Sequence, residues 1–386
     1  MKKAPRRTTK IARRAPTTRP TVAEVDLTAI AHNLKGIRTR VGKSVAIMAV
    51  VKANAYGHGL QHVASFVEPT LADYFGVAFP EEGVELRKAG IRKPIQVFTI
   101  ADQAQASLYA KYGLEATISS TGDVDLLNKE ARKSGKIVQV HLKIDTGMNR
   151  IGVKAADLET IATSLGKARK LELKGIFTHF ATADERNKQF LMHQLDEFRR
   201  CVERLKVLGV EAVHVHCANS ASILDVPETY FTMVRPGVMM YGYYPSRETT
   251  EIIPLRTAMT LKTRVALVKS IAPGESVSYN RRYVATQRTT IATLPIGYAD
   301  GYTRLLSGKA VALIGGKKFP TVGTICMDQM MVDIGAENVR PGDEAVLIGS
   351  QGNGYISARD LAESIGTIPY EICCAISSRV PRTYIQ

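Results

Sequence analysis

The sequence predicts an α/β protein in two parts: an N-terminal (β/α)8 barrel of the TIM type, followed by a mostly antiparallel β domain. Three observations lead to this expectation. The chain has 386 residues, more than one ordinary domain holds. After a basic tail, short β-branched runs alternate with helical patterns across residues 21–255, which is the order of elements in a parallel barrel. Residues 256–386 instead alternate polar and apolar side chains at period two, between Gly and Pro turns, as antiparallel strands do.

Composition excludes several other classes of protein. Hydrophobic residues make up 45% of the chain and charged residues 23%, the balance of a globular protein with buried cores. No apolar run reaches the roughly 18 residues of a membrane-spanning helix, so we expect no membrane association. The five cysteines, one pair of them adjacent, make no disulfide framework and favour a reducing compartment, which we take to be the cytoplasm.

Residues 1–20 form a basic tail. They hold eight Lys or Arg residues and no acidic residue, which is half of the net charge of +16. Their Thr, Pro and Arg content predicts disorder, and they lack the apolar stretch of a secretory signal. A solvated extension, a loose attraction to nucleic acid or anionic surfaces and an organelle-targeting peptide all stay open. Because no nucleic-acid-binding module follows, we expect no nucleic acid to be required.

Eight strands are predicted for the barrel. We expect them at residues 45–51, 73–79, 94–99, 115–119, 137–144, 172–178, 212–217 and 232–240. Apolar residues recur at helical spacing between them, as at Leu60, Val63, Ala64 and Val67. An open doubly wound sheet is the alternative, but it normally stops at about five to seven strands.

In the second part, the alternating segments 259–271, 289–297, 310–316 and 344–350 predict strands, and residues 357–365 predict one helix.

The chemistry of such a barrel lies at the carboxyl ends of its strands, and basic and hydrogen-bonding side chains gather there. Lys52 ends the first predicted strand, and the fifth runs through Lys143 into a segment that ends in Arg150. The other strand ends carry His179, Asn219, Ser220 and Arg235. A cationic rim of this kind suits a phosphorylated ligand. A lysine poised on it can form a Schiff base with pyridoxal phosphate.

Each of these residues also has an ordinary structural interpretation. A lysine after a buried strand is usually a solvated strand end, and His216 could simply satisfy polar groups in the core. His58 and His62 have the spacing of a metal-binding pair, but no Glu lies between them and no third ligand is evident, so we expect no metal. Cys373 and Cys374 are adjacent, which favours a place in the core.

The order of the motifs resembles the alanine racemase family. The segment VVKANAYGHG at residues 50–59 is similar to its cofactor-lysine motif, and further similar segments lie at 145–150, 178–181, 218–221, 235–237, 297–302, 326–329 and 366–371. The likeness covers residues 21–386 and runs through both predicted parts. The sequence departs from the pattern at Asn149, where many members have Gly, at Thr303, where many have Pro, and in the tail.

The resemblance implies an isomerase that uses pyridoxal phosphate. Lys52 would hold the cofactor as a Schiff base, and Arg235, backed by His216, would donate to its pyridine nitrogen. The other residues that would contact the cofactor are Tyr56, Arg150, His179, Asn219, Ser220, Gly237, Val238 and Tyr370. In the family the lysine equivalent to Lys143 is often carbamylated and orients the arginine equivalent to Arg150.

Racemisation needs acid–base groups on both faces of a planar intermediate. Lys52 would serve one face, and Tyr283 matches the family's catalytic tyrosine for the other; Tyr279 is the nearest rival. In the family, the β domain of one subunit covers the barrel of the other. The resemblance therefore implies a homodimer with shared active sites.

The substrate implied is L- or D-alanine, interconverted to supply D-alanine for peptidoglycan. Arg150 would bind the substrate carboxylate, while Met327 and Tyr370 would crowd the side chain and favour a methyl group; Asp328 would lie behind them. A broader-specificity racemase or a decarboxylase of the same fold is the alternative. A pyridoxal-phosphate homeostasis protein is disfavoured, because such barrels lack the second domain.

Overall fold

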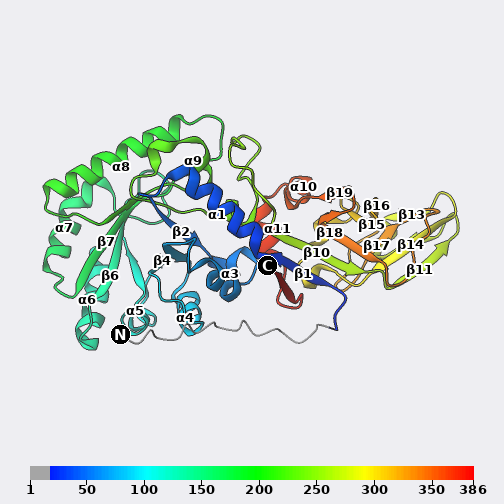
Figure 1. Ribbon diagram of the computed structural model, residues 1–386, viewed down its shortest axis with the longest axis horizontal. Coiled ribbons are helices and arrows are strands. Elements are labelled where there is room, and N and C mark those ends of the chain that lie inside the picture. The colour runs from blue at the N-terminus through cyan, green and yellow to red at the C-terminus, as the bar shows by residue number, and fades with distance from the viewer. Residues whose placement is uncertain (1–17) are drawn as a thin grey trace, which may run out of the picture.

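The computed structural model describes residues 18–386 and consists of a barrel and an elongated β domain that lie end to end (Figure 1). Most of the predicted basic tail, residues 1–17, lies outside the described residues. No helix within residues 18–386 is long and apolar enough to cross a membrane.

The barrel confirms the predicted parallel sheet. Within the described residues its eight strands are parallel, in the order β8-β7-β6-β5-β4-β3-β2-β9. Their bounds are β2 Ala46–Val50, β3 Tyr74–Val77, β4 Ile95–Ile100, β5 Glu115–Ile118, β6 Val138–Lys143, β7 Leu171–Phe177, β8 His214–His216 and β9 Met233–Val234. The seam between β8 and β9 is closed by backbone hydrogen bonds, from Thr232 N to Val215 O at 3.1 Å and from Arg235 N to Ala218 O at 2.9 Å.

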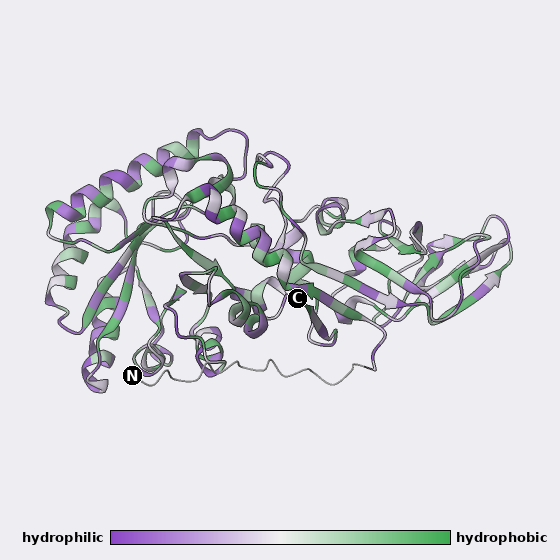
Figure 2. Cartoon of the chain, in the orientation of Figure 1, coloured by the Kyte–Doolittle hydropathy of each residue, from purple (hydrophilic) through white to green (hydrophobic). Residues whose placement is uncertain are grey.

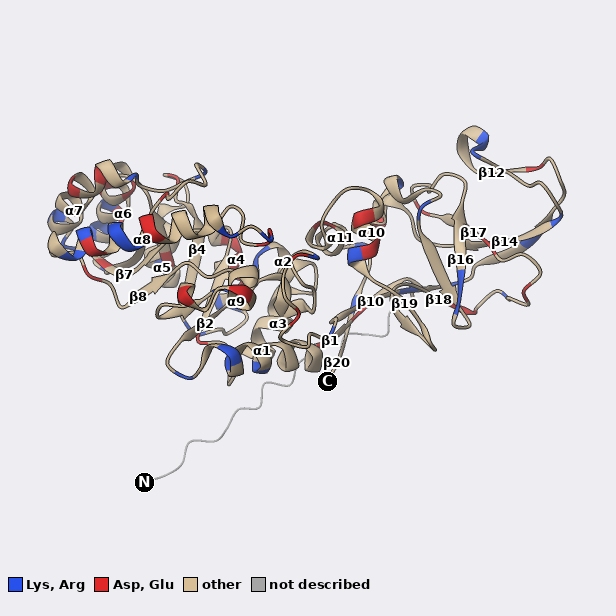
Figure 3. Cartoon of the chain, turned by 90° about the horizontal axis from the view of Figure 1, so that it is seen from above, with Lys and Arg blue, Asp and Glu red and all other residues tan. Residues whose placement is uncertain are grey.

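Helices cover the outside of this sheet (Figure 1). They are α1 Leu27–Val41, α3 Leu60–Val67, α4 Pro80–Lys88, α5 Ala106–Tyr112, α6 Thr121–Ser134, α7 Leu158–Lys167 and α8 Gln189–Val207. The short segments α2 Lys52–Tyr56 and α9 Ser220–Asp225 begin at the carboxyl ends of the strands instead, and the residues inside α2 are not helical. Charged residues recur along these helices (Figure 3), and hydrophobic residues are frequent in both helices and strands of the barrel (Figure 2). The last predicted strand, 232–240, is shorter than expected, because residues Val238–Tyr241 form a 3-10 turn.

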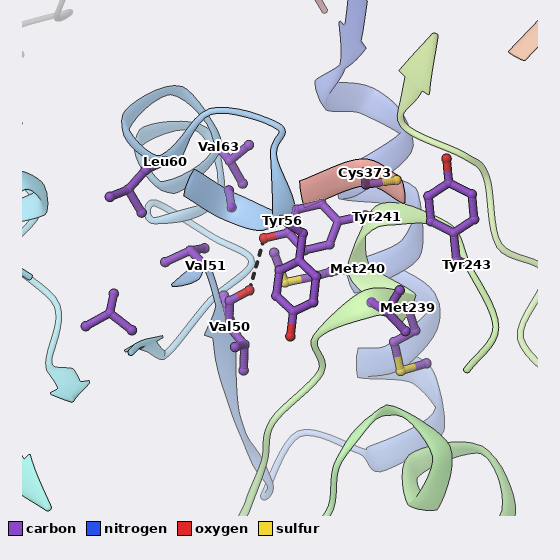
Figure 4. Packing of buried hydrophobic residues seen from close by; sticks show 14 of the residues in the cluster. Val50, Val51, Tyr56, Leu60, Val63, Met239, Met240, Tyr241, Tyr243 and Cys373 are labelled. Atoms are coloured by element: carbon purple, nitrogen blue, oxygen red, sulfur yellow. Dashed lines mark hydrogen bonds between the residues drawn. The ribbon is translucent and has the colours of Figure 1, made fainter. Parts of the chain in front are cut away.

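A dense core lies between α1, α2 and this 3-10 turn (Figure 4). Tyr241 is fully buried and donates from its hydroxyl to Val50 O at 3.0 Å, and its ring lies 5.0 Å from that of Tyr56. The contacts fix the end of β2, where the predicted cofactor lysine begins the next turn.

The β domain confirms a mostly antiparallel sheet, in the order β11-β14-β17-β16-β15-β18-β10-β1-β20, with β19 beside β18. The strand bounds are β1 Val22–Asp26, β10 Met259–Arg264, β11 Leu267–Ile271, β14 Thr289–Leu294, β15 Val311–Ile314, β16 Lys317–Val322, β17 Met330–Asp333, β18 Glu344–Gln351, β19 Gly354–Ile356 and β20 Arg382–Ile385. A separate hairpin pairs β12 (Ser276–Val277) with β13 (Tyr283–Val284), and the helices are α10 Ala358–Ser364 and α11 Pro369–Ala375. The helix predicted at 357–365 is thus α10.

Strand β1 shows that the two parts are interwoven. It pairs antiparallel with β10, Ala23 opposite Leu261, and parallel with β20, Ala23 opposite Arg382. The first residues of the range 21–255, which we predicted for the barrel, therefore belong to the sheet of the β domain.

Arg19 corrects the prediction of a disordered tail through residue 20. Its Nη2 lies 2.6 Å from Oδ1 of Asp300, a fully buried carboxylate, and its Nη1 donates to Arg379 O at 2.5 Å. The described end of the tail is therefore anchored on the β domain.

Candidate active site

A cavity of about 500 Å3 opens at the carboxyl ends of the barrel strands. Ten of the residues predicted from the sequence line it, namely Lys52, Tyr56, Lys143, Arg150, His179, Asn219, Ser220, Arg235, Gly237 and Val238, and Tyr370 joins them from α11. The predicted rim is therefore a single cavity wall.

Lys52 lies at the start of an unusual turn. The four residues after it, from Ala53 to Tyr56, all have positive φ angles of 52–54°, a left-handed turn that costs L-residues about 1–2 kcal/mol each. Two acceptors hold it: Glu82 Oε1 takes the Ala53 N–H at 2.6 Å, and Asn54 Oδ1 takes the Leu60 N–H at 2.8 Å. Sequence patterns give no sign of such a turn, because Lys-Ala-Asn-Ala-Tyr reads as an ordinary helix.

The amine of Lys52 is prepared for chemistry. Burial lowers its pKa below the usual 10.5, and the charge of Arg150 lowers it further, while Glu82 acts in the opposite sense. A larger share of the amine is then unprotonated at neutral pH, the form that can act as a nucleophile or a base.

A small cradle of hydroxyl and backbone N–H groups lines the same cavity. Ser220 Oγ accepts the Gly237 N–H at 2.9 Å, and a Cβ on Gly237 would lie only 2.6 Å from the Tyr56 hydroxyl. Only glycine leaves this space between two hydroxyl groups. The α9 N-terminus begins here, capped by the Asn219 side chain, which accepts the Ser222 N–H at 3.1 Å. Hydroxyls and a helix N-terminus around an open space suit a phosphate group.

Arg235 is buried in the floor of the cavity, with 4% of its surface exposed. Its Nη2 donates to Thr178 O at 2.7 Å and lies 3.3 Å from Nδ1 of His179. Its Nη1 lies 2.7 Å from Nδ1 of His216, so the predicted partner of Arg235 is confirmed as a direct contact.

Lys143 is the second amine in the wall and is almost completely buried. Its Nζ lies 4.6 Å from the ring centroid of Phe177. Burial lowers its pKa well below 10.5, and the charges of Arg235 and Arg150 act in the same direction. An unmodified cation here is disfavoured, so the site would better hold a neutral amine or an anion formed on it.

Tyr283, Met327 and Asp328 do not line the cavity of their own chain, as residues 18–386 describe it. Tyr283 lies in β13, in the part of the β domain farthest from the barrel (Figures 1 and 3). Its hydroxyl donates to Asp333 Oδ2 at 2.5 Å, and burial together with this hydrogen bond raises its pKa to about 12. Asp328 Oδ1 lies 2.6 Å from Arg379 Nη2, and Met327 is half exposed.

One side chain near the cavity, Cys374, differs from expectation. Cys373 is buried as predicted, but Cys374 is exposed and lines the cavity, because α11 turns one face towards Lys52. His58 is buried, and its Nδ1 lies within 3.1 Å of backbone carbonyls of Ala55 and Tyr56. Among the described residues no three His, Cys, Asp or Glu side chains gather as metal ligands would.

Glu115 and His141 were missed by the sequence reasoning. His141 Nε2 lies 2.6 Å from Glu115 Oε2, and its Nδ1 lies 3.1 Å from His216 Nε2. The available signal was a titratable residue within a predicted strand at each position, which by itself does not distinguish a buried contact from an ordinary strand residue.

Fold and site define a class, the (β/α)8-barrel proteins with a lysine of lowered pKa and a group of hydroxyls in a cavity at the carboxyl ends of the strands. Comparison with known proteins is more specific. The family model described as alanine racemase, N-terminal domain, matches residues 25–245, and the one for the C-terminal domain matches residues 258–384. The chain belongs to the alanine racemase family.

Individual relatives agree with this assignment. An alanine racemase of Halothermothrix orenii is 44% identical over 95% of this chain and 97% of its own length. A solved alanine racemase of Clostridium difficile 630 has a TM-score of 0.92 and 39% identity, covering 96% of this chain and 97% of that one. A histidine racemase from Leuconostoc mesenteroides is also similar, with a TM-score of 0.89 and 32% identity, covering 96% and 99%.

Proposed function

We propose that this protein racemises alanine with pyridoxal phosphate, using Lys52 and Tyr283 as the two bases. The observation that carries the proposal is the cavity itself. It brings together in one wall an amine of lowered pKa, a cradle of hydroxyl and N–H groups and a buried guanidinium. Membership of the alanine racemase family supports the same reading.

The residues present fit the coenzyme. Ser220, Tyr56 and the backbone at Gly237 and Val238 line one part of the cavity and would hold its phosphate. Arg235 would face the pyridine nitrogen. Because a guanidinium has only donors, it would not leave a proton on that nitrogen. When bound, pyridoxal phosphate delocalises the electron pair left at Cα once the proton is removed.

Lys52 would hold the coenzyme covalently and, once the substrate has displaced it, would exchange a proton with Cα on one face. Its lowered pKa keeps part of the amine free to accept that proton. His179 lines the same wall and would pack against the pyridine ring. Burial keeps its own pKa well below 6.5, and the charge of Arg235 acts in the same direction. It therefore contributes packing without an added charge.

The base for the other face is Tyr283, and it must come from a second subunit. Within one chain it lies at the far end of the β domain and donates to Asp333. We therefore propose a homodimer in which each β domain covers the partner's barrel, bringing Tyr283, Met327 and Asp328 to the cavity. Cationic groups in the wall, such as Arg150 and Arg235, would then favour the phenolate that a base near neutrality requires.

The substrate would be L- or D-alanine. Arg150 lines the cavity beside Lys52 and would bind the carboxylate. Tyr370, on the same wall, and Met327 of the partner subunit would leave room for little more than a methyl group. A broader-specificity racemase is the second candidate, favoured by the similar histidine racemase fold.

We propose that the protein acts in the cytoplasm and that the D-alanine it forms is used for peptidoglycan. All five cysteines are free thiols, which supports a reducing compartment.

The direct test is to incubate the protein with pyridoxal phosphate and L-alanine and to measure the D-alanine formed, with L-serine and L-histidine as competing substrates. Lys52→Ala is expected to lose both racemisation and the borohydride-reducible absorption of the bound coenzyme. Lys52→Arg is the matched control, since it keeps the charge but forms no Schiff base, and should be equally inactive. A reducible coenzyme in Lys52→Ala would contradict the assignment, and faster turnover of serine or histidine would favour the second candidate.

A further inference from the structure

A row of four buried side chains crosses the interior of the barrel below the cavity. Arg235 Nη1 lies 2.7 Å from His216 Nδ1, His216 Nε2 lies 3.1 Å from His141 Nδ1, and His141 Nε2 lies 2.6 Å from Glu115 Oε2. None of the four is more than 4% exposed. They come from four different parts of the sheet: β5, β6, β8 and the end of β9.

The neighbouring strand makes room for this row. Strand β7 lies between β6 and β8, and at the crossing point it carries Gly175, whose Cβ would lie 2.1 Å from His141 Nδ1. Two residues on, Phe177 stacks on His216 with ring centroids 5.0 Å apart and planes 5° apart. A larger residue at position 175 would block the contact between the two imidazoles.

The residues at the two ends of the row, Arg235 and Glu115, determine which nitrogen of each histidine carries the proton. Burial lowers the pKa of Arg235 to about 10, which still leaves it protonated at neutral pH, and a guanidinium can only donate. Nδ1 of His216 must therefore accept, and its proton sits on Nε2. That proton goes to Nδ1 of His141, which in turn carries its own proton on Nε2 and donates to the Glu115 carboxylate.

The surroundings of His216 agree with a neutral ring. Burial lowers its pKa well below 6.5, and the charge of Arg235 acts in the same direction. His141, His214 and Lys143 are the other titratable groups near it. The row is therefore a buried guanidinium and a buried carboxylate joined through two neutral imidazoles, which offsets the cost of burying either charge alone.

We propose that Glu115 and His141 are positioning residues that act on Arg235 through His216. This rests on the proposed function, in which Arg235 faces the pyridine nitrogen. Nη2 of Arg235 is already engaged by the carbonyls of Thr178 and Cys217, at 2.7 and 3.1 Å. With Nη1 held by His216, the guanidinium has one fixed orientation in the cavity floor, and Glu115 supplies its counter-charge.

The first test is the protonation state of the two rings in the wild-type holoprotein. Nitrogen-15 NMR of labelled histidines is expected to show both His141 and His216 neutral, with the proton on Nε2. A proton on Nδ1 of His216, or a doubly protonated ring, would overturn the proposal. This readout needs no racemase activity, so it separates failure of the inference from failure of the proposed function.

The second test uses variants. Glu115→Leu removes the final acceptor and should move the His216 resonances, shift the visible absorption of bound coenzyme and weaken pyridoxal phosphate binding by about tenfold. Glu115→Gln keeps an acceptor oxygen and should retain the Nε2–H forms with a smaller loss of affinity. Gly175→Ala, which displaces His141, should behave like Glu115→Leu.

Thr117→Val is the matched control. Thr117 is equally buried, lies two residues along the same strand and donates to Val97 O at 2.6 Å, outside the row. It should leave the His216 resonances and the coenzyme absorption unchanged. If Glu115→Leu and Thr117→Val are alike in both readouts, Glu115 is only part of the packing and the proposal fails.

Discussion

Lys52 and Lys143 are two amines in one cavity wall, and their surroundings separate their roles. Lys52 is partly exposed and feels the carboxylate of Glu82, whereas Lys143 is almost fully buried and feels the positive charges of Arg235 and Arg150. A neutral Lys143 amine can add carbon dioxide, and the resulting carbamate is an anion that Arg150 and Arg235 would stabilise. The physical setting thus supports the modification that the family resemblance implies.

We predict that Lys143 is carbamylated. Protein exchanged into carbon-13 bicarbonate should show one carbamate resonance in its carbon-13 NMR spectrum, and Lys143→Ala should lose it. Racemisation by this variant should fall, with KM affected most, because Arg150 loses its anionic partner. A spectrum without a carbamate signal from wild-type protein at neutral pH would refute the modification.

At the scale of single residues, the sequence predicted most of the residues that line the cavity, but not the buried residues behind Arg235. Lys52, Arg150, Ser220 and Arg235 follow strand ends or known motifs, which a sequence displays. Glu115 is different, because its contact with His141 depends on which side chains of β5 and β6 point into the barrel. It also depends on Gly175 in β7, which leaves room for His141. Such contacts are set by packing across the sheet and leave no local pattern.

The element that governs the site is the left-handed turn after β2. Its backbone strain is offset by contacts from distant segments: Arg382 Nε donates to Gly57 O at 3.0 Å, and Gly57 itself packs against the Cys373 carbonyl of α11. Apart from the last one, 232–240, the predicted strands of the barrel lie close to those observed because their sequences are local and rich in apolar residues. The strand β1, the helix α11 and this turn were missed because non-local contacts stabilise them.

We predict that Gly57→Ala destabilises the protein by more than about 2 kcal/mol and dislodges Lys52. Its φ is +82°, and a Cβ would lie 2.2 Å from Cys373 O, so strain and a clash with backbone add together. Gly90→Ala is the control, because Gly90 has a φ of +94° with open space around the Cβ position and should cost only about 1 kcal/mol. Urea unfolding and coenzyme affinity measure both effects; equal losses in the two variants would show that the close approach is unimportant.

For the whole molecule, the chain ends tie the two parts together. Strand β1 joins β10 to β20, and α11 carries Tyr370 and Cys374 from the β domain to the barrel cavity. Arg19 adds an ion pair to Asp300, whose other oxygen accepts the Gly297 N–H at 3.1 Å. The loop that carries Met327 and Asp328 is linked to this cluster through Arg379.

We predict that residues 18–20 contribute to stability. Deleting residues 1–20 should lower the free energy of unfolding by about 1–3 kcal/mol relative to deleting residues 1–17, because the buried Asp300 carboxylate loses a partner. Arg19→Ala in the full chain should reproduce the loss. Identical denaturation curves for the two deletions would mean that Arg379 alone satisfies Asp300.

The central claim is a two-base racemase site shared between subunits, and subunit mixing tests it most directly. Lys52→Ala and Tyr283→Phe chains, each nearly inactive alone, are combined under conditions that allow exchange. Half of the dimers are then mixed, and in each of these one site has both defects and the other has neither. Recovery of roughly a quarter of wild-type racemisation is expected. No recovery, with exchange confirmed by differently tagged chains, would contradict the shared site.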